Sequence, residues 1–380
     1  MKRGGVVHII NSLGQGGAEV MMANLIEVTR NSSPTTLVIG LAHDGVIGEQ
    51  IRASGVNVIA LNIHRTTFPQ TAARLTRLLR ETKPDVVQTW MYHANLIGGL
   101  ATKTAGAPPV AWGVHHADLS PESAKSATRA IAKASALFSH ATPSKVVFCA
   151  EASKVVHERL GYAKKKSAVI PNGFDTTRFT PDPEAPARLK ERIGAPAHAR
   201  LVGLVARFHP VKDHRTFVQA AAIAAQSDAD LHFVLCGKEV NWENEELAGW
   251  IRETGCASRF HLLGLDSEPW LVHAGLDVGC LSSTSEAFPL SVGESMACGV
   301  PCAVTDVGDA SVMVAGSGRV APSQNPAALA AALRELLDLD PAQRAAAGAR
   351  ARSKIEREYS LPAVAARYES VWRQIASAPR

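Results

Sequence analysis

Hydrophobic and polar residues alternate along the chain in blocks typical of a layered α/β protein. Short runs rich in β-branched residues recur throughout, and the stretches between them carry apolar residues at helical spacing. Strands are predicted in the first half at residues 6–10, 36–41, 56–61, 86–89, 110–114 and 168–170. Strands are predicted in the second half at residues 201–206, 231–236, 260–262, 278–282 and 302–305. Because these runs are apolar on both faces, we expect parallel sheets with helices on both sides.

The segments between the strands have the spacing of amphipathic helices. The stretch 71–83 is an example, with three leucines on one face and three arginines on another: Leu75, Leu78, Leu79, Arg74, Arg77 and Arg80. From about residue 325 the chain is Ala-rich and predicted to be helical, with a break at Pro341 and a last helix from about Pro362. No repeat of 20–50 residues is visible.

A proline-rich segment separates the two halves. Residues 171–186 contain four prolines, and the strand–helix rhythm restarts after them. We therefore predict two doubly wound domains with a hinge near residues 175–185. Open parallel sheets bind ligands at the carboxyl ends of their strands, so functional residues are expected in the loops that follow strands.

Composition narrows the class of protein. The chain is 46% hydrophobic and 20% charged, which is ordinary for a globular protein and excludes collagen-like and disordered chains. Its six cysteines form no CxxC pair, so we expect small buried residues rather than a zinc or disulfide framework. No apolar run is long enough to cross a bilayer, and the apolar stretch 6–10 is too short for a secretory signal. The expected location is the cytoplasm.

Charge is distributed unevenly around the net value of +5. Residues 1–180 hold 20 Lys and Arg against 11 Asp and Glu, whereas residues 181–380 hold 20 against 24. A basic first half suits an anionic partner, such as an acidic lipid surface at the inner face of a membrane or a phosphorylated acceptor; solvated helix faces explain it equally well. Nucleic acid is not expected, because aromatic residues are only 5% and none interleave with a basic stretch.

A glycine-rich turn follows the first predicted strand. The sequence NSLGQGGAE at 11–19 places Gly16 and Gly17 where a helix begins. Such a turn lets the backbone approach an anion or a sugar, but it also serves as a simple tight connection. The segment is neither GxGxxG nor a Walker loop, so it carries neither fingerprint.

Two cations follow the first strand of the second half. Arg207 and Lys212 lie five residues apart in a loop that runs into a helix. An arginine fork and a lysine point charge suit a diphosphate, although two solvated loop cations are the simpler alternative.

Two carboxylates flank a predicted helix start after the strand at 278–282. Glu286 lies before the helix, Pro289 suits its first turn, and Glu294 lies about one turn further along. Gly299 and Pro301 are expected to end the helix. The two carboxylates can hold hydroxyls of a ligand whose anionic part meets the free N–H groups; the alternative is a helix-dipole partner.

Together these segments resemble the retaining glycosyltransferases of family 4, which have the GT-B fold. The resemblance spans residues 5–375 and rests on four segments in the family's order: Gly16-Gly17, PNGFD at 171–175 with Phe179-x-Pro181, Arg207 with Lys212, and Glu286-x7-Glu294. It implies two doubly wound, Rossmann-like α/β domains facing across a cleft. The acceptor-binding domain is expected at 1–175 and the nucleotide-sugar-binding domain at 176–361, with the C-terminal helix of about 362–380 packing back on the first.

The resemblance also implies roles for individual residues. The predicted catalytic residues are Arg207 and Lys212 on the donor diphosphate, Glu286 on a hydroxyl of the transferred sugar, and His115 near that sugar. Because His116 follows directly, the histidine assignment is open by one residue. The predicted donor-binding residues match positions in the family's loops that contact the nucleotide sugar. They are Gly16, Gly17, Gly237, Leu263, Phe288, Pro289, Leu290 and Glu294, and Glu294 is expected on the ribose. Ala206 and Ala287 stand where the family more often has glycine.

The implied activity is transfer of a sugar from a nucleotide-sugar donor, expected to be UDP-linked, to a glycan or lipid-linked acceptor with retention. No cofactor is expected, because the nucleotide sugar is a substrate. No metal site is expected either, because the scattered histidines do not have the spacing of metal ligands. Three alternatives remain: a nucleotide-sugar epimerase of the same fold, a sugar phosphorylase of the same fold, and a non-catalytic module that binds nucleotide sugars.

Overall fold

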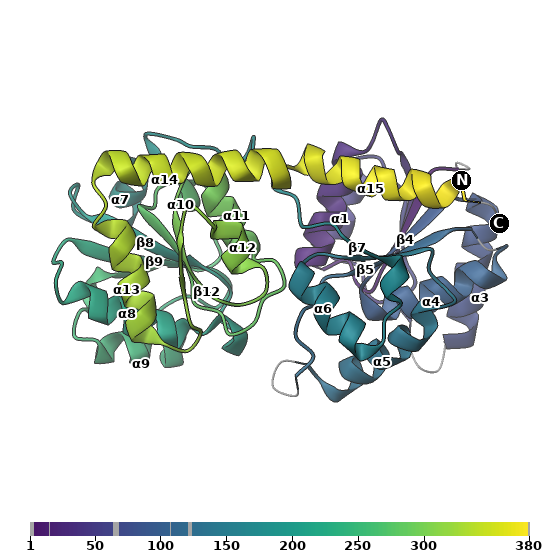
Figure 1. Ribbon diagram of the computed structural model, residues 1–380, viewed down its shortest axis with the longest axis horizontal. Helices are drawn as coiled ribbons and strands as arrows, with labels where there is room; N and C mark the ends of the chain where they lie inside the picture. Colours follow the sequence, from purple (N-terminus) through teal and green to yellow (C-terminus); the bar gives the residue numbers. More distant parts are fainter. Residues whose placement is uncertain (1–3, 15, 64–67, 107, 121–123, 379–380) are drawn as a thin grey trace. The chain divides into compact units, whose positions relative to one another are not determined.

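The chain divides into two units, each built around one parallel sheet. The computed structural model describes residues 4–378 except 15, 64–67, 107 and 121–123. Unit 1 comprises Met1–Gly173 and Leu361–Arg380, and unit 2 comprises Phe174–Ser360. Helices cover both faces of each sheet (Figure 1). The fold class predicted from the sequence, Rossmann-like α/β in both halves, is confirmed.

Unit 1 contains a seven-stranded parallel sheet of order β3-β2-β1-β4-β5-β6-β7. Its strands are β1 Val6–Ile10, β2 Thr35–Gly40, β3 Val58–Ala60, β4 Val86–Trp90, β5 Val110–Val114, β6 Lys145–Phe148 and β7 Ser167–Val169. Its helices are α1 Gly17–Val28, α2 Val46–Ala53, α3 Phe68–Thr82, α4 Met91–Thr104, α5 Ser126–Ser139, α6 Glu151–Leu160, the short η2 Lys164–Lys166 and α15 Leu361–Ala376. The chain leaves β1 in one direction and resumes at β4 in the other, which places a topological switch point between these strands.

Side chains of β1 show why the sheet needs helices on both faces. Val6 and Ile10 belong to one hydrophobic cluster with residues of α1 and α15, whereas Val7 and Ile9 belong to the opposite cluster with residues of α3 and α4. All four side chains are buried. A strand buried on both sides has to be apolar at nearly every position, as the sequence pattern indicated.

Helix α15 returns from unit 2 and completes the core of unit 1. Its residues Tyr368 and Trp372 are buried in the cluster that also contains β1 and α1, and Figure 1 shows α15 beside α1. The indole Nε1 of Trp372 donates a hydrogen bond of 3.0 Å to Oε1 of Gln88, a fully buried residue of β4. The last helix is therefore part of unit 1's interior.

Unit 2 contains a six-stranded parallel sheet of order β10-β9-β8-β11-β12-β13. Its strands are β8 Arg200–Val205, β9 Leu231–Cys236, β10 Phe260–Leu262, β11 Val278–Leu281, β12 Cys302–Thr305 and β13 Arg319–Ala321. Its helices are α7 Ala185–Ile193, η3 Pro210–Lys212, α8 His214–Ala225, α9 Glu245–Glu253, η4 Ala257–Arg259, α10 Pro269–Ala274, α11 Leu290–Ala297, α12 Ala310–Val314, α13 Pro326–Leu337, α14 Pro341–Lys354 and the π-helix η5 Ile355–Tyr359. Here the switch point lies between β8 and β11.

The predicted hinge segment is ordered structure within unit 2. Phe174 donates its backbone N–H to Tyr359 O, and its ring stacks on Phe288 at 6.1 Å. The Asp175 carboxylate accepts hydrogen bonds from the backbone of Thr177 and Arg178 and so closes a tight turn. The chain passes from unit 1 to unit 2 at 173/174, just before the predicted hinge at 175–185, and returns to unit 1 at 360/361.

Smaller differences from the sequence predictions have local causes. The strand expected at 56–61 is only Val58–Ala60. Two strands were not predicted: the four-residue β6, and β13, which is three residues long with partly exposed side chains. All six cysteines are free and five are buried. Burial raises the pKa of Cys298 and Cys302 to about 12, which keeps these thiols protonated. Across the described residues, no helix is both long and apolar enough to span a membrane.

Candidate active site

The loops after β8 and β11 meet at the switch point of unit 2. The first loop contains η3, and the second leads to α11. Thr284 donates its N–H to Val211 O at 2.9 Å, and the Ser282 hydroxyl donates to Lys212 O at 2.9 Å. These bonds tie the backbone of η3 to the neighbouring loop, so the side chains that the two loops carry have a fixed relative position.

Lys212 and Glu286, both predicted from the sequence, form an ion pair across this junction. Lys212 Nζ lies 2.5 Å from Glu286 Oε1, and the Ser283 hydroxyl donates to the same oxygen at 2.8 Å. The side chain of Glu286 is 12% exposed and that of Lys212 is 24% exposed. Among the described residues Glu286 Oε2 has no hydrogen-bond donor, so this oxygen and the remaining Lys212 protons are available to a ligand.

Arg207 follows β8 and is exposed, with no ion-pair partner in the described part of the chain. Its backbone is supported by the loop after β9, where Phe208 donates its N–H to Lys238 O at 2.8 Å. Gly237 has φ 153°, and a Cβ at this position would lie 2.2 Å from Ala206 O and 2.8 Å from Arg207 N. Only glycine permits this close approach, so Gly237 sets the path of the chain at Arg207.

Helix α11 starts beside Glu286 and leaves free amides at its first turn. Pro289 is the N-cap residue rather than part of the first turn, with an extended backbone. The backbone N–H groups of Leu290 and Ser291 have no acceptor among the described residues. The helix ends as predicted: Gly299 has φ 75°, and Val300 N–H bonds to Ser295 O in a Schellman arrangement. The free amides together with Lys212 form a positively polarised surface.

Glu294 lies one turn along α11 but contacts a residue that the sequence did not point to. Its Oε2 is 3.2 Å from Nε2 of His273, a fully buried residue of α10. His273 Nδ1 lies 2.7 Å from the Ser295 hydroxyl. Nothing in the spacing of His273 and Glu294 signals this contact, because it depends on the packing of α10 against α11.

In unit 1 the predicted histidine, His115, follows β5. Both ring nitrogens are buried without a hydrogen-bond partner, and the ring lies 5.2 Å from that of Trp90 at the end of β4. Burial lowers the pKa of His115 to about 4; nearby Asn172 offsets part of this shift, although no hydrogen bond of good geometry links the two side chains. The imidazole is therefore neutral at pH 7, and no described residue uses either ring nitrogen in a hydrogen bond.

The neighbouring histidine has a different environment. His116 Nδ1 accepts the Asp118 N–H at 3.3 Å, and its carbonyl accepts the Ser153 hydroxyl at 2.6 Å. These contacts hold the loop after β5 in place. They favour His115 over His116 as the imidazole with free hydrogen-bonding capacity.

The other predicted residues lie at the carboxyl edges of the two sheets. Gly16 is the N-cap of α1 and Gly17 its first residue, directly after the β1 loop. Leu263 follows β10, where its N–H bonds to Leu235 O. Phe288 is buried against Tyr359 at 5.3 Å, so its ring supports the α11 start and only its backbone can meet a ligand.

The predicted residues of unit 2 fall into separate contact groups. The Arg207 loop packs against Gly237, and Lys212 pairs with Glu286. Glu294 contacts His273 instead of either group. The structure therefore brings the lysine and the first glutamate together and gives the second glutamate a partner of its own.

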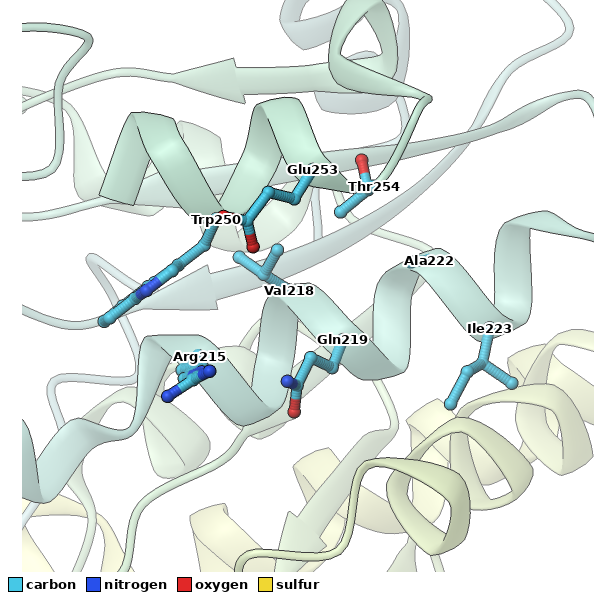
Figure 2. A pocket seen from close by; sticks show the side chains of 8 residues that line it. All are labelled: Arg215, Val218, Gln219, Ala222, Ile223, Trp250, Glu253 and Thr254. Atoms are coloured by element: carbon cyan, nitrogen blue, oxygen red, sulfur yellow. The ribbon is translucent and has the colours of Figure 1, made fainter. Parts of the chain in front are cut away.

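A pocket of about 340 Å³ elsewhere on unit 2 contains none of these residues. It lies between α8 and α9, and Figure 2 shows its lining side chains projecting from the two helices. Trp250 forms one wall, with Arg215 and Glu253 among the polar groups. In the described part of the chain, no cluster of three or more His, Cys, Asp or Glu side chains is arranged to hold a metal ion.

Comparison with protein-family models identifies both halves of the chain. Residues 15–178 match the model described as Glycosyltransferase Family 4, and residues 187–354 match that of Glycosyl transferases group 1. The chain belongs to the family 4 glycosyltransferases. The two matches meet close to the boundary between the units.

Individual relatives of this family 4 glycosyltransferase differ in what their names specify. One relative is an Escherichia coli UDP-Gal:alpha-D-GlcNAc-diphosphoundecaprenol alpha-1,3-galactosyltransferase, to which this chain is 25% identical. The alignment covers 69% of this chain and 68% of the relative. Another relative is a Thermobispora bispora D-inositol 3-phosphate glycosyltransferase, to which this chain is 33% identical. That alignment covers 55% of this chain and 51% of the relative. Among solved structures, Anabaena Alr3699/HepE in complex with UDP matches 98% of this chain and 100% of its own, with a TM-score of 0.86 and 21% identity. The fold of this glycosyltransferase is that of the GT-B enzymes.

Proposed function

We propose that this glycosyltransferase transfers a sugar from a UDP-linked donor to a glycan or lipid-linked acceptor and retains the anomeric configuration. The observation that carries the proposal is the meeting of Lys212, Glu286 and the start of α11 at the switch point of unit 2. The place is the one where open α/β sheets bind ligands, and its charges suit a diphosphate next to a hydroxyl-bearing sugar.

Each group has a separate task in the proposed donor complex. Lys212 and Arg207 bind the diphosphate, and the Leu290 and Ser291 amides bind its oxygens at the helix start. Glu286 accepts a hydrogen bond from a hydroxyl of the transferred sugar through its free Oε2, and Glu294 accepts hydrogen bonds from the ribose hydroxyls. UDP as the nucleotide is supported by the UDP-dependent E. coli relative and by the UDP complex of the Anabaena structure.

Charge stabilisation of the leaving group follows from the same residues. When the glycosidic bond breaks, negative charge develops on the β-phosphate, where fixed donors are most effective. Hydrogen bonds to charged groups contribute about 1.5–3 kcal/mol each. Two cations and a helix start then supply roughly 5–8 kcal/mol, whereas enzymatic accelerations require about 8–23 kcal/mol. Positioning and exclusion of water supply the remainder.

Retention is assigned to attack by the acceptor hydroxyl on the face that the phosphate leaves. A covalent alternative would need Glu286 as the nucleophile. Its Oε1 accepts from Lys212 and from Ser283, and both hydrogen bonds lower the nucleophilicity of the carboxylate. Glu286 and Glu294 also have different partners, so they do not form the acid–base couple of a hydrolase.

A lipid-linked acceptor would bring the basic unit 1 to an anionic membrane surface. Lys164 and Lys165 are exposed, and Leu137 at the end of α5 is 74% exposed. Lys166 joins the two segments, since its Nζ donates to His140 O. This surface is the better candidate than the arginine face of α3, where Arg77 pairs with Glu81. Co-sedimentation with phosphatidylglycerol vesicles, lost on K164E/K165E, tests the contact; equal sedimentation of both proteins contradicts it.

The activity test is incubation with UDP-glucose, UDP-galactose and UDP-N-acetylglucosamine, with and without a lipid-diphosphate-linked acceptor. The proposal predicts donor consumption that requires the acceptor and is unchanged by EDTA. Interconversion of donors without acceptor would indicate an epimerase, and binding without turnover a non-catalytic module. Proton NMR of the product reports the anomeric configuration, and an inverted product would contradict retention.

A further inference from the structure

The contact between Glu294 and His273 places a buried imidazole where it can hold the Glu294 carboxylate in one orientation. His273 is fully buried, and its Nε2 is 3.2 Å from Glu294 Oε2. No hydrogen bond of good geometry satisfies this nitrogen within the described residues, which leaves the carboxylate as its partner. Glu294 is partly exposed, and its Oε1 has no hydrogen-bond partner in the described chain. One carboxylate oxygen thus faces a buried imidazole while the other remains available.

Hydrogen-bond logic assigns the tautomer of His273. The Nδ1 atom lies 2.7 Å from the Ser295 hydroxyl, which can donate to it. Nε2 then carries the proton and faces the Glu294 carboxylate. The opposite tautomer would place a lone pair against a negative charge, which is unfavourable in a buried site. The imidazole therefore connects the Ser295 hydroxyl to the Glu294 carboxylate.

The imidazole itself is held in place from a third side. The Phe179 ring packs edge-on against it with ring centroids 5.7 Å apart. Arg352 fixes the Phe179 backbone by donating to its carbonyl at 3.1 Å. With Ser295 on one side and Phe179 on another, His273 has little freedom to follow Glu294 if that side chain rotates.

We propose that His273 is a positioning residue for the donor: in the donor complex it donates Nε2–H to Glu294 Oε2, so that Oε1 is presented to the ribose hydroxyls. This inference rests on the proposed function, in which Glu294 binds the ribose. The alternative is a buried histidine that only stabilises the packing of α10 on α11. The positioning role and the packing role can be distinguished with variants that keep a polar atom at the position of either Nδ1 or Nε2.

Asparagine and glutamine provide the matched pair. In H273N the amide oxygen takes the position of Nδ1 and accepts from the Ser295 hydroxyl, but the amide group does not reach Glu294. The amide nitrogen of H273Q reaches the position of Nε2 and can donate to the carboxylate. Both side chains are polar and shorter or similar in size, and thermal unfolding of each variant reports the structural cost separately.

The probes are UDP and 2′,3′-dideoxy-UDP, measured by isothermal titration. Loss of one hydrogen bond to a charged group predicts that H273N raises the Kd of UDP about tenfold, whereas H273Q stays within about threefold of wild type. Neither variant should change the Kd of dideoxy-UDP, which has no ribose hydroxyls for Glu294. Equal weakening of UDP by both variants, or equal weakening of both ligands, would show a structural role only and overturn the inference.

E294Q separates this inference from the proposed function. If E294Q binds UDP as wild type does, Glu294 is not on the ribose and the donor assignment itself fails. If E294Q weakens UDP, the inference predicts that H273N causes no further loss in the E294Q background, because His273 acts through that carboxylate. Additive losses in the double variant would show that His273 acts elsewhere.

Discussion

Lys212 and Glu286 are 74 residues apart in the sequence, yet their side chains meet with Nζ 2.5 Å from Oε1. The pair joins the loop after β8 to the loop after β11, the two strands on either side of unit 2's switch point. Glu286 is nearly buried, so its charge depends on Lys212 and Ser283 for compensation. One ion pair therefore fixes both the cation proposed for the diphosphate and the carboxylate proposed for the sugar.

Replacing Lys212 with alanine should lower kcat at least about tenfold, because a charge-assisted hydrogen bond to the leaving phosphate is lost. The change also leaves the Glu286 carboxylate unpaired next to the donor. Steady-state kinetics with saturating donor measures the effect. The K212A/E286Q variant is the control, since it removes the unpaired charge but does not restore the cation. Wild-type kcat in K212A would remove Lys212 from the reaction.

A methyl group at Gly237 should disturb the backbone at Arg207. The Cβ of G237A would lie 2.2 Å from Ala206 O, and its φ of 153° disfavours any side chain. We expect a loss of stability of about 1–3 kcal/mol and weaker UDP binding. G249A is the matched control: Gly249 lies in α9, and apart from its chain neighbours and the backbone of its own helix no atom is within 4 Å of the position that its methyl group would take. That variant should be neutral or more stable by up to about 1 kcal/mol, and equal behaviour of the two would contradict the role of Gly237.

Buried histidines predict a stability that declines in mild acid. Burial lowers the pKa of His8 to about 3 and those of His115, His157, His214 and His261 to about 4, from an ordinary value of 6.5. The unfolded chain therefore binds more protons than the folded chain between pH 6.5 and about 4. Stability is fully present above pH 6.5 and is lost as the pH falls through this window.

Urea unfolding at pH 7.5, 6 and 5 measures this dependence. The slope should approach about 1.4 kcal/mol per pH unit for each histidine that stays neutral. H157Q removes one of these histidines, so the slope should decrease. The glutamine leaves a polar neighbour for the Tyr92 hydroxyl, which lies 2.7 Å from His157 Nε2. A free energy of unfolding that is flat from pH 7.5 to 5 would contradict the assignment of neutral histidines.

Trp372 should be as important to unit 1 as a residue of its sheet. It is buried in the core and donates to Gln88 at 3.0 Å. W372A should cost about 3–5 kcal/mol in the unfolding free energy of unit 1, and W372F about 1–3 kcal/mol, because it leaves Gln88 Oε1 unsatisfied. Arg373, its exposed neighbour on α15, provides the control R373A. Comparable urea midpoints for W372A and R373A would contradict the packing of α15 in the core.

The sequence predicted much of the fold because most buried parallel strands have a characteristic apolar composition. The runs at 6–10, 110–114 and 231–236 coincide with β1, β5 and β9. Strand β13 was missed because Arg319 and Val320 are partly exposed, so the run at 319–321 has no apolar signature. The four-residue strand β6 was missed although three of its residues are buried. The π-helix at 355–359 was missed as well, since no residue in it interrupts the helical pattern.

The candidate site could be predicted residue by residue but not as an arrangement. Lys212 and Glu286 were each predicted from loop position and family resemblance, but their pairing depends on β8 lying next to β11, which the sequence order does not reveal. His273 was missed for a related reason. It lies within a six-residue helix, and only tertiary packing brings it to Glu294.

The central claim is that unit 2 binds the phosphates of a nucleotide sugar through Arg207, Lys212 and the start of α11. Titration of wild type and of R207A/K212A with UDP and with uridine, which has no phosphates, tests it most directly. We predict that wild type binds UDP at least about 100-fold more tightly than uridine, and that the double variant loses most of this difference without weaker uridine binding. A double variant that retains the full preference for UDP would contradict the claim.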